Sequence, residues 1–185
     1  MPDHHTYSTS DTADLRRVLG EIQRRGAIGR LDLGEAIEHA DRYAAAVPST
    51  ARTAIDLGSG GGLPGLVIAV RCPELAATLV ERRAKRADLL RYGVRALGIG
   101  ARVTVLDADV AVLVDDSDRE PVDLVTARSF APLPQVLEVA RQLLTPAGAC
   151  VVSTPPLATV PPLVPGWSGE LVPSGVWRFH VEPLP

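Results

Sequence analysis

From residue 53 onward, short apolar runs alternate with amphipathic stretches. The apolar runs have the length and composition of buried strands, and they lie at 53–57, 76–81, 102–106, 122–127 and 148–153. Helical patterns lie between them, at 64–71, 83–97, 109–114 and 132–144. Strands that alternate with helices are typical of a parallel sheet with crossover helices. The pattern predicts a doubly wound, Rossmann-like α/β domain at 51–185.

Two helical patterns precede this domain. The first has one apolar face and would be capped by Asp11 or Thr12, and its apolar positions are Leu15, Val18, Leu19 and Ile22. The second should run from 33 to 46 and end before Pro48, because the residue before a proline avoids the helical region. We expect residues 1–10 to form a polar tail and residues 1–50 to form a short helical extension.

The C-terminal part has a different pattern. Prolines crowd into 155–165, which makes a regular helix there improbable. Two strand patterns follow, at 169–173 and 177–183, and they are separated by Pro-Ser-Gly. We expect them to pair as an antiparallel hairpin at the edge of the otherwise parallel sheet.

The composition excludes several classes of protein. The 185 residues are 46% hydrophobic and 22% charged, which fits a folded domain rather than a disordered chain. The longest apolar stretch, 63–70, is far shorter than the ~20 residues of a membrane helix, and the N-terminus lacks a secretory pattern, so we expect a cytoplasmic protein without a membrane partner. Cys72 and Cys150 fit no metal spacing, and no metal is expected. The sequence carries no signal for an oligomeric state.

A glycine-rich segment after the first predicted strand carries the strongest chemical signal. The strand delivers Asp56, and glycines follow at positions 58, 60 and 62. Such glycines let the backbone turn sharply and approach a ligand, while the next helix presents free N–H groups. Glu81 ends the next strand, 23 positions after Gly58, where a doubly wound sheet places a carboxylate for ribose hydroxyls.

Two kinds of cofactor are bound by this arrangement of glycines and an acid. Gly60, Gly62 and Gly65 match the dinucleotide pattern G-x-G-x-x-G, but that match begins two residues beyond Gly58. An Asp two residues before G-x-G-x-G is the arrangement with which class I methyltransferases hold S-adenosylmethionine, and we favour it over a dinucleotide or a purely structural turn. The residues expected around this cofactor are Asp56, Gly58, Ser59, Gly60, Gly62, Leu63, Glu81, Asp109 and Val110. A helix cap is the alternative role of Asp109.

Four blocks together resemble one methyltransferase family. They are Asp56-Leu-Gly-Ser-Gly-Gly-Gly-Leu-Pro-Gly-Leu, Glu81-Arg-Arg-Ala-Lys-Arg-Ala-Asp-Leu-Leu, Thr126-Ala-Arg-Ser-Phe-Ala-Pro-Leu and, before the first strand, Ile37-Glu-His. They span about 35–152 and resemble the bacterial small-subunit ribosomal RNA guanine-N7 methyltransferases, RsmG, also called glucose-inhibited division protein B. The resemblance implies a class I fold, S-adenosylmethionine as cofactor and small-subunit ribosomal RNA, or the ribosomal subunit, as partner.

The chain departs from that family on the substrate side. The N-terminal region is short and lacks the family's Asn-Leu-Thr stretch, Arg42 replaces an aspartate, and Ser153-Thr-Pro-Pro replaces Lys-Gly. A methyltransferase of a small metabolite therefore remains an alternative. A second alternative is a non-catalytic RNA- or protein-binding module that keeps the fold. The net charge of −3 also means that any contact with RNA must be local.

Guanine N7 already carries a free lone pair, so its methylation requires no general base. Catalysis would rest on holding the nitrogen, methyl and sulfur in line, which can contribute ~7–11 kcal/mol. The candidates for catalytic roles toward the substrate are Arg128 and Lys85. A forked Arg128 on O6 and N7 would mask the reacting atom, so we assign it to a phosphate, the cofactor carboxylate or O6 alone, with a sheet-edge ion pair as the alternative.

Lys85 and Arg86 would occupy the first turn of a helix, where acids are favoured, and this conflict often marks a site. His39 could stack on a base or fill the interface between the helical extension and the sheet. Phe130 is the better stacking candidate. Four arginines of the first helical pattern could add phosphate contacts: Arg16, Arg17, Arg24 and Arg25.

Overall fold

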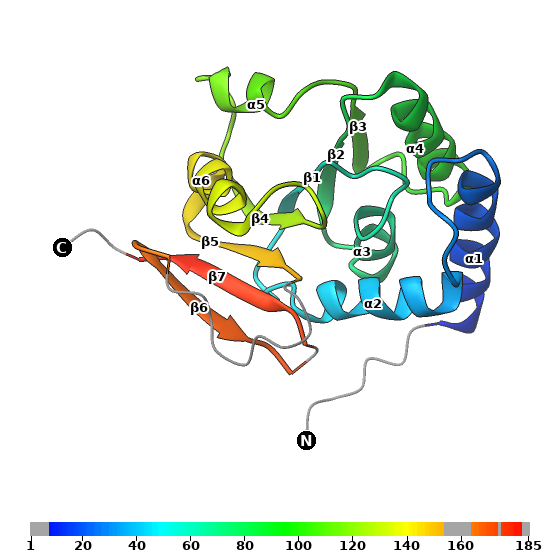
Figure 1. Cartoon of the computed structure of the whole chain (residues 1–185), viewed down its shortest axis with the longest axis horizontal. Helices are drawn as coiled ribbons and strands as arrows, with labels where there is room; N and C mark the ends of the chain where they lie inside the picture. Colours follow the sequence, from blue (N-terminus) through cyan, green and yellow to red (C-terminus); the bar gives the residue numbers. More distant parts are fainter. Residues whose placement is uncertain (1–7, 154–163, 174, 183–185) are drawn as a thin grey trace.

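One seven-stranded sheet organises the chain in a computed structural model, which describes residues 8–153, 164–173 and 175–182. The strand order is β3-β2-β1-β4-β5-β7-β6 (Figure 1). The strands are β1 Thr53–Leu57, β2 Ala76–Val80, β3 Val103–Leu106, β4 Val122–Ala127, β5 Leu144–Val152, β6 Trp167–Leu171 and β7 Trp177–Val181. The first five are parallel, whereas β7 is antiparallel to β5 and to β6. The predicted doubly wound sheet with a C-terminal antiparallel hairpin is confirmed.

Helices cover both faces of this sheet. They are α1 Thr9–Arg24, α2 Leu33–Ala45, α3 Gly65–Arg71, α4 Ala84–Ala96, α5 Ala111–Asp115 and α6 Leu133–Leu143. The helices α3 and α4 pack on one face and α5 and α6 on the other (Figure 1). Trp177 and Phe179 of β7 extend the core on the α6 side.

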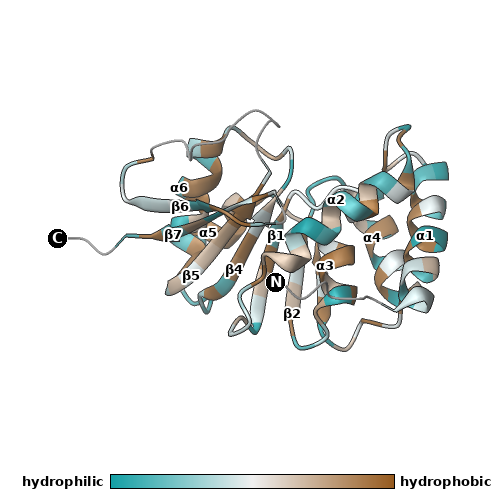
Figure 2. Cartoon of the chain, turned by 90° about the horizontal axis from the view of Figure 1, so that it is seen from below, coloured by the Kyte–Doolittle hydropathy of each residue, from teal (hydrophilic) through white to brown (hydrophobic). Residues whose placement is uncertain are grey.

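The two N-terminal helices share the core of the sheet domain. The apolar face predicted for the first helix is fully buried in α1, against α2 and α4. Figure 2 shows α1 beside α4 at one end of the molecule. The division of the chain at residue 50 stays a prediction, but α1 and α2 contribute buried side chains to the same core as α3 and α4.

Several element boundaries differ from the sequence prediction. The strand β6 covers Trp167–Leu171 instead of 169–173, and β7 ends at Val181 instead of 183. The helix α1 begins at Thr9, so residues 9 and 10 are helical and not part of a tail, while residues 1–7 lie outside the described chain. β5 begins at Leu144 instead of 148, directly after α6, because Leu144 pairs with Val122 before a register shift. The prediction for 155–165 falls almost entirely outside the described residues.

Candidate functional site

The glycine loop, residues 58–65, and Glu81 meet at the carboxyl ends of β1 and β2. Leu57 of β1 pairs with Val80 of β2, so Gly58 and Glu81 follow their strands at the same edge of the sheet. The Glu81 carboxylate is 6% exposed; Oε2 accepts the N–H of Gly60 at 3.0 Å and Oε1 accepts the N–H of Arg83 at 2.8 Å. One side chain therefore holds both the glycine loop and the start of α4.

Glycine is required where the loop passes close to other groups. Gly58 has a φ of 65°, and a Cβ there would lie 2.7 Å from Cδ2 of Phe130. A Cβ on Gly65 would lie 2.5 Å from Oδ2 of Asp56 and 2.6 Å from Cδ2 of Leu79. The loop is thus packed from above by an aromatic ring and from below by a carboxylate.

Asp56 supports the loop from within the protein. It is 3% exposed, and Thr126 Oγ1 donates to its Oδ1 at 2.6 Å. Burial raises the pKa of Asp56 from its ordinary value of 3.8 to about 6, although the hydroxyl donors and the charge of Arg128 oppose the rise. Ser59 Oγ donates to the backbone carbonyl of Asp56 at 3.0 Å. Asp56 therefore shapes the loop instead of lining the space above it.

A cleft of about 340 Å³ opens above the loop, within the size range of small-molecule sites. Four of the predicted cofactor residues line it: Gly58, Glu81, Asp109 and Val110. The other predicted residues, Asp56, Ser59, Gly60, Gly62 and Leu63, form or support the loop and do not line this cleft. The Asp109 Oδ1 accepts the N–H of Ala111, the first residue of α5, at 3.1 Å, although the N-cap position itself is Val110. The cofactor role of Asp109 stays a prediction.

Several lining residues were not predicted around the cofactor. They are Val80, Arg82, Arg83, Arg86, Ala108, Ser129 and Phe130. Arg82 lies 3.5 Å from Asp109 across the opening. The sequence did contain a signal for these arginines. They directly follow Glu81, and residues just after the end of a strand lie at the same edge of the sheet as the acid that ends it.

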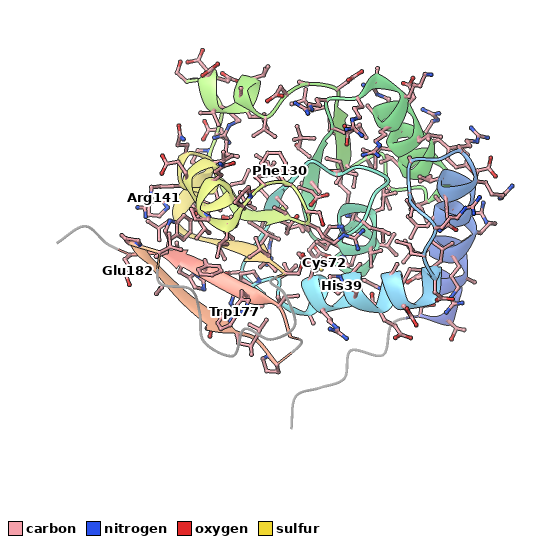
Figure 3. All side chains as sticks on the ribbon, viewed as in Figure 1. His39, Cys72, Phe130, Arg141, Trp177 and Glu182 are labelled. Atoms are coloured by element: carbon pink, nitrogen blue, oxygen red, sulfur yellow. The ribbon has the colours of Figure 1, made fainter. Side chains whose placement is uncertain are left out.

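Arg128 is not among the residues that line the cleft. Ser129 has a φ of 54°, and the chain after it brings Phe130 into the cleft, whereas Arg128 does not line the cleft. Burial and the charges of Arg128 and Arg42 lower the pKa of His39 on α2. Figure 3 shows Phe130 and His39 on opposite sides of the end of β4. Arg128 therefore belongs to the side of the sheet edge that α2 covers.

Tyr43, which sequence reasoning missed, fixes α2 against this edge. Its hydroxyl donates to the Ala127 carbonyl at 3.3 Å and accepts the Ser153 N–H at 2.8 Å. Burial raises the pKa of Tyr43 to about 12. The His39 ring lies 5.7 Å from the Tyr43 ring, and His39 Nδ1 is buried without a hydrogen bond within the described chain.

Lys85 also lies outside the cleft. It is exposed on the first turn of α4 and lines a neighbouring cavity with Arg83 and Arg86, which border both spaces. Adjacent helix positions point about 100° apart, so Arg86 can line the cleft as well as the neighbouring cavity, whereas Lys85 lines only the neighbouring cavity. Within 8–153, 164–173 and 175–182, no cluster of metal-ligating side chains occurs and no helix has the length and apolarity to cross a bilayer.

Comparison with known protein families identifies the family to which this arrangement of glycine loop and acid belongs. The family model GidB, described as rRNA small subunit methyltransferase G, matches residues 31–153. The chain belongs to the GidB family. The resemblance to RsmG is therefore confirmed, and the matched region contains the glycine loop, Glu81, Asp109 and Arg128.

Two GidB relatives illustrate the match. A ribosomal RNA small subunit methyltransferase G from Rhizorhabdus wittichii is 48% identical over 88 residues, covering 48% of this chain and 39% of the relative. Its namesake from Methylibium petroleiphilum is 33% identical over 136 residues, covering 74% and 56%. The chain spans about half the length of the curated relatives it matches.

Solved structures show the same fold. The cofactor-bound Rv0187 from MTB has a TM-score of 0.67 and 16% identity, covering 97% of this chain and 94% of that one. A SAM-dependent methyltransferase from Thiobacillus denitrificans, in complex with S-adenosyl-L-homocysteine, has a TM-score of 0.53 and 18% identity, covering 74% and 54%. Together with the GidB match, they confirm the methyltransferase fold predicted from the sequence.

Proposed function

We propose that this chain uses S-adenosylmethionine to methylate small-subunit ribosomal RNA, at N7 of a guanine. The observation that carries the proposal is the Glu81 carboxylate, which lines the cleft and holds the glycine loop through the Gly60 N–H at 3.0 Å. Family membership supports the same reaction. The predicted site roles below are part of this proposal.

The cleft residues fit a nucleoside with a positively charged sulfur. Each Glu81 oxygen accepts one backbone N–H and keeps further acceptor capacity, so the carboxylate can also accept ribose hydroxyls. We place the adenine against Asp109 and Val110, which line the same cleft. Gly58 presents backbone without a side chain, and the Phe130 ring packs over it, which restricts water.

Methyl transfer to N7 does not require a general base from the protein. Bound S-adenosylmethionine would supply a methyl group activated by its sulfonium, and the acceptor nitrogen would supply a lone pair. The protein must then orient the base and exclude water. Arg128 and the half-buried His39 ring are the groups that we place toward the base or its phosphate, on the α2 side of the β4 end.

Lys85 takes a different place in this proposal from the one predicted. Because it lines the neighbouring cavity, we assign it to the RNA backbone and not to the reacting atoms. Arg128 keeps its predicted role, with O6 or a phosphate as partner, since a forked contact on O6 and N7 would block transfer.

The test is transfer of a labelled methyl group. Small ribosomal subunits and deproteinised RNA, both from cells that lack this chain, are incubated with the protein and labelled S-adenosylmethionine. We expect label in RNA and strand scission at a single guanine after reduction and aniline treatment, which cleaves at N7-methylguanine. Binding of S-adenosylmethionine without label in either substrate would refute the ribosomal assignment and favour a small-molecule acceptor.

A further inference from the structure

A second cavity, of about 400 Å³, lies beside the cofactor cleft. It is formed by the end of α1, the segment after it and the first turns of α4. Four cationic residues line it: Arg25, Arg83, Lys85 and Arg86. The other lining residues are small or apolar, and none of the described residues that line the cavity carries a carboxylate. The chain as a whole has a charge of −3, so this concentration of positive charge is local.

Three of these four cations have no counter-ion among the residues that the structure describes. Arg25 pairs with Glu21 at 2.5 Å and lies over the Tyr92 ring. Within the described residues, the side chains of Arg83, Lys85 and Arg86 make no ion pair or hydrogen bond.

The carboxylates of the neighbouring elements are already engaged. Asp88 pairs with Arg91 at 2.9 Å, Asp109 lies 3.5 Å from Arg82, and both oxygens of Glu21 are taken by Arg24 and Arg25. The buried Glu81 carboxylate, which accepts the Arg83 N–H at 2.8 Å, offsets part of the positive charge, but within the described residues no carboxylate pairs with the side chains of Arg83, Lys85 and Arg86.

The arrangement is unfavourable for the protein alone. Arg83 is the N-cap residue of α4, and Lys85 and Arg86 follow in its first turn, which contains no acid. Like charges held together repel, and cations at the start of a helix oppose its dipole. An anion in the cavity would remove both conflicts.

The cavity is adjacent to the cofactor cleft. Arg83 and Arg86 line both spaces. The segment after α1 also packs on the glycine loop, since a Cβ on Gly61 would lie 3.0 Å from the Ala27 carbonyl oxygen and would clash with Ile28. A ligand in the cavity would thus lie next to a ligand in the cleft.

We propose that this cavity binds a backbone phosphate of the RNA whose base is presented to the cleft. The inference rests on the proposed function, because RNA is taken as the source of the phosphate. Charge complementarity supports it, since lysine and arginine are the residues that contact nucleic-acid phosphates. The exposure of Arg83 and Lys85 suits a chain that passes over the surface better than a small anion that is enclosed.

RNA binding, measured without cofactor, tests the proposal. A fluorescein-labelled 20-nucleotide RNA is titrated with the protein at several salt concentrations, for the wild type and for Lys85→Ala, Lys85→Arg and Arg95→Ala. Arg95 is the matched control, because it is an exposed cation in the last turn of the same helix and lies outside both cavities. Thermal unfolding verifies that each variant is folded.

We expect Lys85→Ala to weaken RNA binding by ~10-fold and to lower the slope of log affinity against log salt by ~0.7, the contribution of one phosphate contact. Lys85→Arg should retain binding, and Arg95→Ala should change it less than twofold. Equal losses in Lys85→Ala and Arg95→Ala, or no RNA binding by the wild type, would overturn the proposal.

A free anion is distinguished by competition. At constant ionic strength, replacing chloride by millimolar inorganic phosphate should displace little RNA if the cavity recognises the RNA chain. Displacement by phosphate together with unchanged RNA affinity in Lys85→Ala would assign the cavity to a small anion and overturn the RNA assignment. If RNA binds through Lys85 but no methyl is transferred, the proposed function fails while this inference stands.

Discussion

Asp56→Asn tests the account of the buried carboxylate beneath the glycine loop. The carboxylate is 3% exposed, and its Oδ1 accepts a hydrogen bond from Thr126 at 2.6 Å. Burial raises its pKa from an ordinary value of 3.8 to about 6. Asparagine has nearly the same shape and can still accept from Thr126, but it carries no charge at any pH.

The sign of the pH effect follows from proton binding. Between pH 4 and pH 6 the unfolded chain has already released the Asp56 proton, whereas the folded chain still holds it. The free energy of unfolding therefore falls as the pH rises through this window. A difference of about two pKa units corresponds to ~3 kcal/mol, at 1.36 kcal/mol per unit. Full stabilisation by this group is present below pH 4 and lost above pH 6.

Urea denaturation at pH values from 4 to 8 measures the effect, with fluorescence of the buried Trp167 and Trp177 as the signal. We expect the free energy of unfolding of Asp56→Asn minus that of the wild type to increase by ~3 kcal/mol between pH 4 and pH 7, because only the wild type loses stability over this range. Any constant offset from the substitution cancels in this comparison. A relative stability that does not change across this range would refute the raised pKa and the desolvation argument behind it.

Three further substitutions test the division of roles. Gly60→Val should abolish binding of S-adenosylmethionine in calorimetry, because Gly60 has a φ of 58° and a β-branched residue cannot keep the loop path; unchanged affinity would refute this view of the loop. Arg128→Ala should leave cofactor affinity near wild type and lower the turnover of methyl transfer by up to ~100-fold, the cost of a misplaced substrate; a loss confined to cofactor affinity would contradict its placement. Gly65→Ala should lower the free energy of unfolding by ~1–3 kcal/mol, because its Cβ would lie 2.5 Å from Asp56 Oδ2. Gly29 has open space around it, so Gly29→Ala should leave the free energy of unfolding nearly unchanged, and thermal denaturation measures both variants.

The strands were predictable because buried parallel strands are continuous apolar runs, and β4 was predicted to the residue. The start of β5 was missed because Thr-Pro-Ala-Gly after Leu144 has the chemistry of a turn, and only pairing with Val122 makes the segment a strand. Pairing between distant segments overrides local preference, and a single sequence does not display it.

The site was predictable where chain order decides position. Glycines after the first strand and an acid after the second reach the same edge of a doubly wound sheet, and Gly58 and Glu81 do so. The direction of each side chain was not predictable. Lys85 and Arg128 were expected at the site but lie outside the cleft, whereas Arg86 and Phe130 line it. In each pair, the residues are one or two positions apart, and helix phase or the left-handed turn at Ser129 separates them.

Calorimetric titration of the wild type and Glu81→Gln with S-adenosylmethionine tests the central claim, that the cleft between the glycine loop and Glu81 holds this cofactor. We expect saturable binding at one site. Glu81→Gln should weaken it by ~10–100-fold, the loss expected for hydrogen bonds to a charged acceptor. Absence of binding by the folded wild type, or equal affinity of the two proteins, would contradict the account.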